Sequence, residues 1–261
     1  MSDAAPVRLA VTVEGPRDAP PLVLGNSLGT TAELWQPQLA ALRGRFRLIR
    51  YEHRGHAGSP APAGPYTLAD LGGDVLRLLG DLGVTRAAYA GISLGGMVGM
   101  WLAANAPERI GALAVGCTSA GFPDRAPWEQ RAAAVRSGGL APPLSGQIVS
   151  RWFTPAFAAR QPEVPASFIA TLERDVQPDG YAACCDAIAA MDLRPSLGRI
   201  TAPTLVIAGS EDPATPPWHA AVIARGIAGS RLRVVRGASH LANVSHAAEV
   251  TALLTGHLLG R

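Results

Sequence analysis

Apolar residues along the chain gather in short runs that are separated by segments with helical spacing. Several of these runs are apolar almost throughout, as expected for β-strands covered on both faces. The seven predicted strands begin near Val7, Pro21, Phe46, Arg86, Gly111, Pro203 and Ser230. Apolar residues at positions 68, 71, 75, 78 or 79, and 82 recur every three or four residues, which predicts a helix with one apolar face. Further helices are predicted over 31–43, 94–104 and from 245 or 246 to 259.

This alternation of strands and helices predicts an α/β fold with a mostly parallel sheet and helices on both faces. Residues 120–197 interrupt the alternation, because they contain helix-like pieces, prolines and clustered aromatics but no convincing strand. We therefore predict three segments. Residues 1–119 form the first part of the core, 120–197 a helical cap insertion and 198–261 the second part of the core.

Composition excludes several classes of protein. Among the 261 residues, 48% are apolar and 16% charged, which is incompatible with a disordered chain, and the net charge of +3 gives no reason to expect nucleic acid or a membrane surface as a partner. All 23 basic residues are arginine, so no lysine can form a Schiff base. The three cysteines, two of them adjacent, suit neither a disulfide framework nor a zinc site. No signal peptide or transmembrane run is recognisable, so we expect a cytoplasmic protein.

The stretch "AGISLGG" places Ser93 between a predicted strand and a predicted helix. In a chain with 29 glycines, a lone G-x-S-x-G pattern is weak evidence. The strand–turn–helix setting strengthens it, because a nucleophile elbow needs a sharp, strained turn with small residues on either side. Ser93 is therefore the candidate nucleophile, with Gly91 and Gly95 permitting close packing. The alternative is a tight turn without chemistry.

A serine nucleophile needs a histidine base and a carboxylate that orients the base. In this type of fold the three follow the chain order Ser, acid, His, at the carboxyl ends of strands. Asp212 in "PTLVIAGSEDPATPP" and His240 in "RLRVVRGASHLANV" occupy the expected places. Glu211 is the alternative acid. A solvated or capping role is the default expectation for the other histidines, His53, His56, His219, His246 and His257.

Oxyanion stabilisation usually requires two backbone N–H groups. We assign them to Leu94, which follows the nucleophile, and to Leu28 in the loop "GNSLGTT". The other interpretation of that loop is a plain strand-to-helix connection, and the sequence does not separate the two.

Together these segments resemble the α/β-hydrolases, and within them the 3-oxoadipate enol-lactonases. The resemblance runs from about Pro21 to the last helix, and its most specific motifs are "GISLGGMVG" and the "CC" dipeptide in "GYAACCDAIAAMDLR". It departs from the family where Tyr-Asp-x-Arg-Gly-His-Gly is usual, since Glu52 and Ala57 replace the acid and the last glycine. The departure weakens the inference about substrate more than the inference of a hydrolase.

The resemblance implies an α/β-hydrolase that opens 3-oxoadipate enol-lactone in aromatic catabolism (the β-ketoadipate pathway), without metal or cofactor. The substrate is then a small lactone or ester with a carboxylate, which arginine suits. Arg131 in the cap is the first candidate, followed by Arg136, and Trp128 and Trp152 are candidate pocket walls. Alternatives are a carboxylesterase, a C–C bond hydrolase, a perhydrolase or a non-catalytic ligand receptor on the same fold. The oligomeric state is not predicted.

Overall fold

A seven-stranded sheet forms the centre of the molecule, for which the computed structural model describes residues 6–260. Its strand order is β1-β3-β2-β4-β5-β6-β7, and only the edge strand β1 runs antiparallel, to β3. The strands are β1 (Val11–Glu14), β2 (Pro21–Gly25), β3 (Arg47–Tyr51), β4 (Ala87–Ile92), β5 (Ile110–Gly116), β6 (Thr204–Gly209) and β7 (Arg231–Val235). All seven predicted strands are present, although the first begins at Val11 rather than near Val7.

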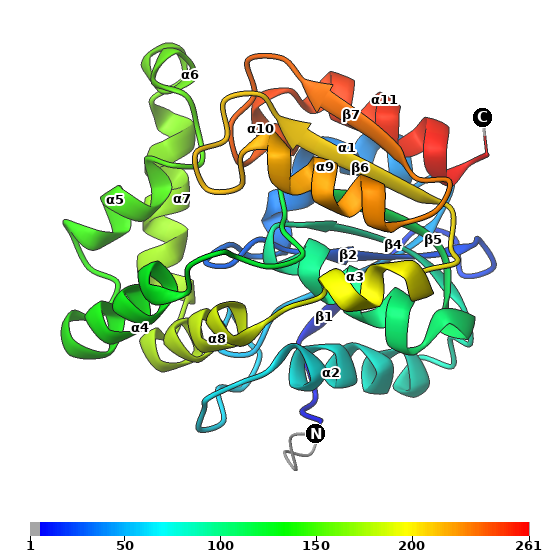
Figure 1. Cartoon of the computed structure of the whole chain (residues 1–261), viewed down its shortest axis with the longest axis horizontal. Coiled ribbons are helices and arrows are strands. Elements are labelled where there is room, and N and C mark those ends of the chain that lie inside the picture. The colour runs from blue at the N-terminus through cyan, green and yellow to red at the C-terminus, as the bar shows by residue number, and fades with distance from the viewer. Residues whose placement is uncertain (1–5, 261) are drawn as a thin grey trace.

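Helices cover both faces of this sheet (Figure 1). On one face lie α1 (Gln36–Leu42) and α11 (Ala247–Leu258), which contact each other, with α10 (Ala242–Ser245) and the 3-10 helix η1 (Ala32–Trp35) beside them. The other face carries α2 (Leu68–Asp81), α3 (Leu94–Asn105), α9 (Pro217–Gly226) and the 3-10 helices η2 (Pro107–Arg109) and η3 (Arg194–Arg199). The architecture is the predicted α/β fold, with a mostly parallel sheet and helices on both faces.

The helices also follow the local sequence signals. Thr67 caps α2 in a capping box with Asp70, and the apolar face that the spacing predicted is buried in the core. One prediction was inaccurate, since the helix expected over 31–43 is divided into η1 and α1. Pro37 lies in the first turn of α1 and lacks an N–H, so it is compatible with a helix that starts there but not with the interior of a longer one.

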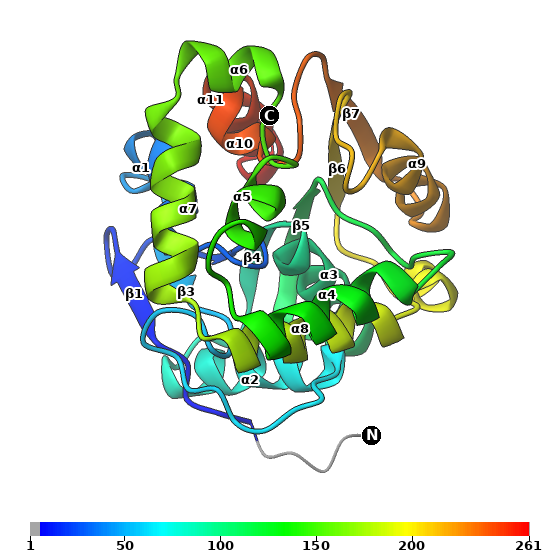
Figure 2. The ribbon, with the colours of Figure 1, turned by 90° about the vertical axis from the view of Figure 1, so that its left-hand side faces the viewer.

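Five α-helices lie between β5 and β6, beside the carboxyl ends of the strands (Figure 2). They are α4 (Ala126–Gly138), α5 (Leu144–Val149), α6 (Pro155–Arg160), α7 (Glu163–Asp175) and α8 (Pro178–Ala190). The helices α4 and α8 pack along each other, and α5 packs on α7. No strand of the sheet comes from the described residues of this segment. The exact division at residues 120 and 197 stays a prediction.

The central strands bring two loops together. Gly25, the last residue of β2, lies in register with Gly91 near the end of β4. Because parallel strands end at the same edge of the sheet, the loop that follows β2 lies directly beside the turn that follows β4. These two connections frame the candidate site.

Candidate active site

Ser93 occupies the sharp turn between β4 and α3. Its backbone angles are φ 53° and ψ −115°, a conformation that costs a residue with a side chain about 1–3 kcal/mol. The end of β5 and the loop after it hold Ser93 there. Its N–H donates to the carbonyl of Gly116, and its own carbonyl accepts from the hydroxyl of Thr118 at 2.7 Å. The strained turn predicted from the sequence is therefore present.

Glycines on both sides make the turn possible. A Cβ on Gly91 would lie 2.4 Å from the carbonyl carbon of Gly95, and a Cβ on Gly95 would lie 2.3 Å from that of Gly25. Real Cβ atoms do not approach backbone so closely, so the sequence must keep glycine at these positions for α3 to pack against the two strands. The N–H of Gly95 also donates to the carbonyl of Asn26, which ties the turn to the loop after β2.

Asp212 and His240 form a hydrogen-bonded pair in which the histidine Nδ1 lies 2.8 Å from the carboxylate Oδ2. Asp212 follows β6 and also accepts from the N–H groups of Ala214 and Thr215 and from the Thr215 hydroxyl. Burial alone would raise the pKa of Asp212, but the charge and hydrogen bond of His240, with the Thr215 bonds, lower it to about 2. The carboxylate is thus ionised and accepts from Nδ1–H, which leaves Nε2 of His240 free to take a proton. Glu211 is exposed and has no contact of this kind.

One small, narrow pocket brings most of the predicted residues together. It is lined by Ser93, His240, Leu28, Trp128, Arg131 and Trp152, and also by Ser27, Ile148, Arg151, Tyr181 and Ala214. Ser93 and His240 come from the sheet edge, whereas most of the remaining wall comes from α4, α5, α8 and the loop after α5. Asp212 lies behind His240. The catalytic roles of these residues stay predictions.

The loop after β2 presents an unused amide at the pocket. Thr30 N–H donates to the carbonyl of Ser27, which closes a turn with Leu28 and Gly29 in the middle. Gly29 has φ +82°, the left-handed conformation that this position of a type II turn requires. No described group accepts a hydrogen bond from the N–H of Leu28. The N–H of Leu94 begins α3, so it has no partner within the helix. Both amides are available to an oxyanion.

Among the arginines of the helical segment, Arg131 is half-buried and its guanidinium lies 4.8 Å from the centre of the Trp128 ring. Arg136, the second candidate, instead forms an ion pair with Asp186 and does not line this pocket. Arg151 and Tyr181 line the pocket but were not predicted. Their only sequence signals were membership of the "RWFTPAF" and "GYAACC" motifs, which do not say which way a side chain points.

The expectation that the other histidines are solvated or capping was wrong for four of the five. His53, His56, His219 and His257 are buried, and each has a hydrogen-bonded ring nitrogen. Burial lowers the pKa of His53 to about 3 and those of His56 and His219 to about 4, so these rings are neutral. Only His246 fits the expectation, as the residue that caps α11.

Neither a metal site nor a membrane span is found in the part of the chain that the structure describes. No group of three or more His, Cys, Asp or Glu in residues 6–260 is arranged to hold a metal ion. None of the described helices combines the length and the apolar character that crossing a bilayer demands. The prediction that the chemistry needs no cofactor stays a prediction.

Comparison with known proteins supports the resemblance noted from the motifs. Residues 20–247 match the family described as alpha/beta hydrolase fold. The 3-oxoadipate enol-lactonase 2 of Acinetobacter baylyi is 40% identical over 92% of this chain and 89% of its own, and the enol-lactonase 1 of the same organism is 36% identical over 95% and 92%. The crystal structure of the enol-lactonase from Burkholderia xenovorans LB400 superposes with a TM-score of 0.93 at 40% identity, covering 96% of each chain.

Proposed function

This chain belongs to the alpha/beta hydrolase fold family, and we propose that it is a serine hydrolase that opens the ring of 3-oxoadipate enol-lactone to give 3-oxoadipate. One observation carries the proposal. Ser93, at a strained strand–helix turn, lines the same pocket as His240, whose other ring nitrogen is bonded to the buried Asp212. The substrate is inferred from the enol-lactonase relatives, and its carboxylate is compatible with the two arginines, Arg131 and Arg151, that line the pocket.

In the first half of the reaction, Oγ of Ser93 attacks the lactone carbonyl while Nε2 of His240 takes its proton. Asp212 holds the ring in the tautomer that can accept this proton and stabilises the imidazolium. The tetrahedral oxyanion receives hydrogen bonds from the N–H groups of Leu28 and Leu94. Because both amides are fixed before the substrate arrives, little reorganisation is needed when the charge develops.

The ring bond between the acyl carbon and the ring oxygen then breaks. The leaving group is an enolate, which is more stable than an ordinary alkoxide, and it becomes a ketone after protonation. His240 returns the proton at this step. In the second half it activates a water molecule that attacks the acyl-enzyme, so that the carboxylic acid leaves and Ser93 regains its proton.

The helices between β5 and β6 provide the residues that recognise the substrate. The lactone carries a free carboxylate, and a guanidinium can hold a carboxylate with two hydrogen bonds. Arg131 is half-buried among Trp128 and the other pocket residues, so solvent screens its charge less than that of a surface arginine. Trp128 and Trp152 also line the pocket and offer apolar surface to the reacting ring.

Steady-state kinetics on 3-oxoadipate enol-lactone and on p-nitrophenyl acetate test the proposal directly. We expect kcat/KM for the lactone to exceed that for the ester by about 10- to 100-fold, since only the lactone offers a carboxylate to the arginine. Preference for the ester would indicate a carboxylesterase. Labelling of Ser93 by a fluorophosphonate without turnover of either substrate would indicate a receptor with an activated serine.

A further inference from the structure

A short segment after β3, residues 52–56, holds the loop after β2 that carries Leu28. We call residues 26–32 the oxyanion loop. The carboxylate of Glu52 spans the two ends of this loop, because its Oε1 accepts from the N–H of Ala32 at 2.9 Å and its Oε2 from the Nδ2 of Asn26 at 3.2 Å. The same Asn26 amide also donates to the carbonyl of Tyr51. One carboxylate therefore joins the two ends of the oxyanion loop, and we call this arrangement the clasp.

Two buried histidines hold the middle of the loop and its link to the nucleophile. His56 accepts from the N–H of Gly29 at its Nε2, while its Nδ1 donates to the carbonyl of Arg54. His53 donates from Nε2 to the carbonyl of Asn26, which also accepts from the N–H of Gly95 in the nucleophile turn. Both rings are buried and neutral, so they act as fixed hydrogen-bonding groups rather than charges.

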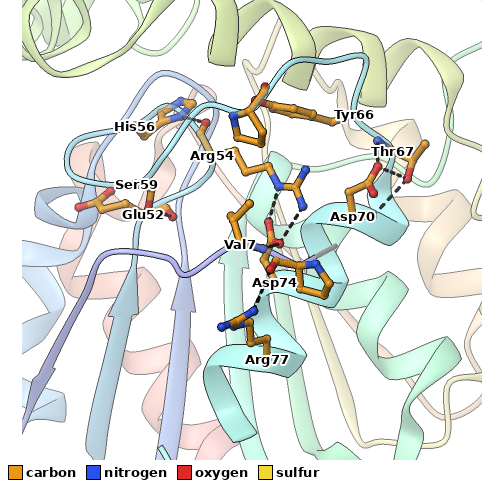
Figure 3. A network of polar contacts seen from close by, with 12 residues as sticks. Val7, Glu52, Arg54, His56, Ser59, Tyr66, Thr67, Asp70, Asp74 and Arg77 are labelled. Atoms are coloured by element: carbon orange, nitrogen blue, oxygen red, sulfur yellow. Dashed lines mark hydrogen bonds and ion pairs between the residues drawn. The ribbon is translucent and has the colours of Figure 1, made fainter. Parts of the chain in front are cut away.

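This segment has its own anchor in the core. Arg54 makes a two-pronged ion pair with Asp74 of α2, with distances of 2.6 and 2.8 Å, and both side chains are only 1% exposed. Figure 3 shows Arg54 lying between Asp74 and the ring of Tyr66, with Glu52 and His56 on the loop beside it. The segment that holds the oxyanion loop is thus rigid itself.

The amide of Leu28 is not used by the loop itself. The N–H groups of Gly29, Thr30 and Ala32 are all engaged, whereas the N–H of Leu28 has no acceptor among the described residues, and Leu28 lines the pocket. We propose that Glu52 is a positioning residue of the oxyanion hole, whose ionised carboxylate clasps the oxyanion loop so that the Leu28 N–H meets the developing oxyanion. This inference rests on the proposed serine mechanism but not on the identity of the lactone.

Glutamine cannot replace this carboxylate, because both partners of Glu52 are donors. One end of a glutamine amide would accept, while its NH₂ would face either the Ala32 N–H or the Asn26 NH₂. Turning the Asn26 amide over does not solve this, since its Oδ1 would then face the Tyr51 carbonyl oxygen. Aspartate keeps two acceptor oxygens and the charge, although it is one carbon shorter.

The clasp depends on pH with a definite sign. Burial raises the pKa of Glu52 to about 7; the Ala32 N–H and the charge of Arg50 oppose this rise, and Glu33 and Asp175 add to it. Neutral His53 and His56 face the same loop. Below pH 7 the carboxyl gains a proton and loses an acceptor, so kcat falls. Stability changes in the opposite sense, because the raised carboxyl pKa contributes stability that is fully present below the ordinary value of 4.5 and is lost as the pH rises to about 7.

The experiment compares Glu52→Gln and Glu52→Asp with the wild type, using Glu33→Gln as the matched control. Glu33 is a nearby carboxylate with an exposed side chain that bonds to no amide of the oxyanion loop. The readouts are kcat and KM on the enol-lactone and on p-nitrophenyl acetate, the pH profile of kcat, and inhibition by phenylboronic acid, whose adduct with serine mimics the tetrahedral oxyanion. Thermal unfolding is measured for each variant.

For Glu52→Gln we expect kcat to fall about 10- to 100-fold with KM within twofold, since losing a whole oxyanion donor costs about 10²- to 10³-fold. The phenylboronic acid Ki should rise by the same factor, and the deficit in kcat relative to the wild type should shrink below pH 7, where the wild type has lost the carboxylate as well. Glu52→Asp should stay within about threefold of the wild type and keep an ionisation, and Glu33→Gln should match the wild type above pH 8.

Wild-type kcat and boronate affinity in a folded Glu52→Gln variant would overturn the proposal, as would a loss carried by KM alone. If Glu52→Gln does not fold, Glu52→Asp decides. The ratio of its kcat to that of the wild type must then rise as the pH falls below 7, because aspartate has the lower intrinsic pKa and the effect of His240 is common to both proteins, and a ratio that does not change with pH contradicts the proposal. The ester separates the two inferences, since failure to turn over the lactone leaves the clasp testable on p-nitrophenyl acetate.

Discussion

The pocket has two walls that are built differently. On the sheet side, Ser93, Asp212 and His240 are each at most 4% exposed, and backbone strain and hydrogen bonds define their positions. On the helical side, Arg131 is half-buried and rests on an aromatic ring, and Arg151 is exposed. The sheet side thus holds the residues proposed to carry out the reaction, and the helical side holds those proposed to recognise the substrate. A rigid wall suits a reaction that needs atoms held within fractions of an ångström, and a looser wall can accommodate different substrates.

Removing the proposed nucleophile on the sheet side should have the largest effect on activity. Ser93→Ala should lower kcat by about 10⁴- to 10⁶-fold, leaving only the contribution of the oxyanion hole and of binding. Initial rates on the enol-lactone measure this. Ser93→Gly is a useful companion, because glycine tolerates φ +53°. This variant should be as inactive as Ser93→Ala but should unfold at a higher temperature than Ser93→Ala does. Near-normal rates in either variant would show that Ser93 is not the nucleophile.

The next largest effect separates the two neighbouring acids. Asp212→Asn should cost about 10⁴-fold in kcat. The asparagine NH₂ can donate to Nδ1 of His240, which favours the tautomer that carries its proton on Nε2 and so cannot accept one from Ser93. Glu211→Gln serves as the control and should change kcat less than about twofold, since Glu211 is exposed. Steady-state kinetics that ranked the two variants in the reverse order would reassign the acid to Glu211.

A third comparison contrasts ion pairs from the two regions. Asp74→Asn leaves the Arg54 guanidinium buried without its partner and should lower the free energy of unfolding by about 3–5 kcal/mol. Asp192 forms a similar pair with Arg194 near the end of the helical segment, but both side chains are about half exposed. Asp192→Asn should therefore cost less than about 1 kcal/mol. Urea unfolding of both variants tests this, and equal losses would refute the distinction.

The smallest expected effect tests the difference between the two walls of the pocket most directly, because it should depend on the substrate. Arg131→Met should lower kcat/KM on the enol-lactone by about 10- to 150-fold, the value of a partly desolvated charged hydrogen bond, and leave p-nitrophenyl acetate almost unaffected. Arg136→Met is the matched control, since Arg136 pairs with Asp186 away from the pocket. Equal losses on both substrates would give Arg131 a structural role. No loss on either substrate would indicate that another arginine holds the carboxylate, with Arg151, which also lines the pocket, as the next candidate.

Much of the fold was predictable from the sequence because its signals are local. The seven apolar runs correspond to the seven strands, and the glycines around Ser93 are required by atoms only a few residues away or on the adjacent strand. Asp212 and His240 could be placed because parallel strands end at one edge of the sheet, so position along the chain translates into position in space. The helical segment could be identified by the absence of strand patterns, although the arrangement of its helices could not.

By itself, then, the sequence determined the order of strands and helices, the strained turn at Ser93 and the places of Asp212 and His240 after their strands. Only the tertiary structure decided that Asp212 rather than Glu211 contacts His240, that Arg131 rather than Arg136 lines the pocket, and that His53 and His56 are buried. The physical reason is one of range. Strand and turn propensities arise from neighbours along the chain, whereas the burial and partners of a side chain depend on segments that only folding brings together.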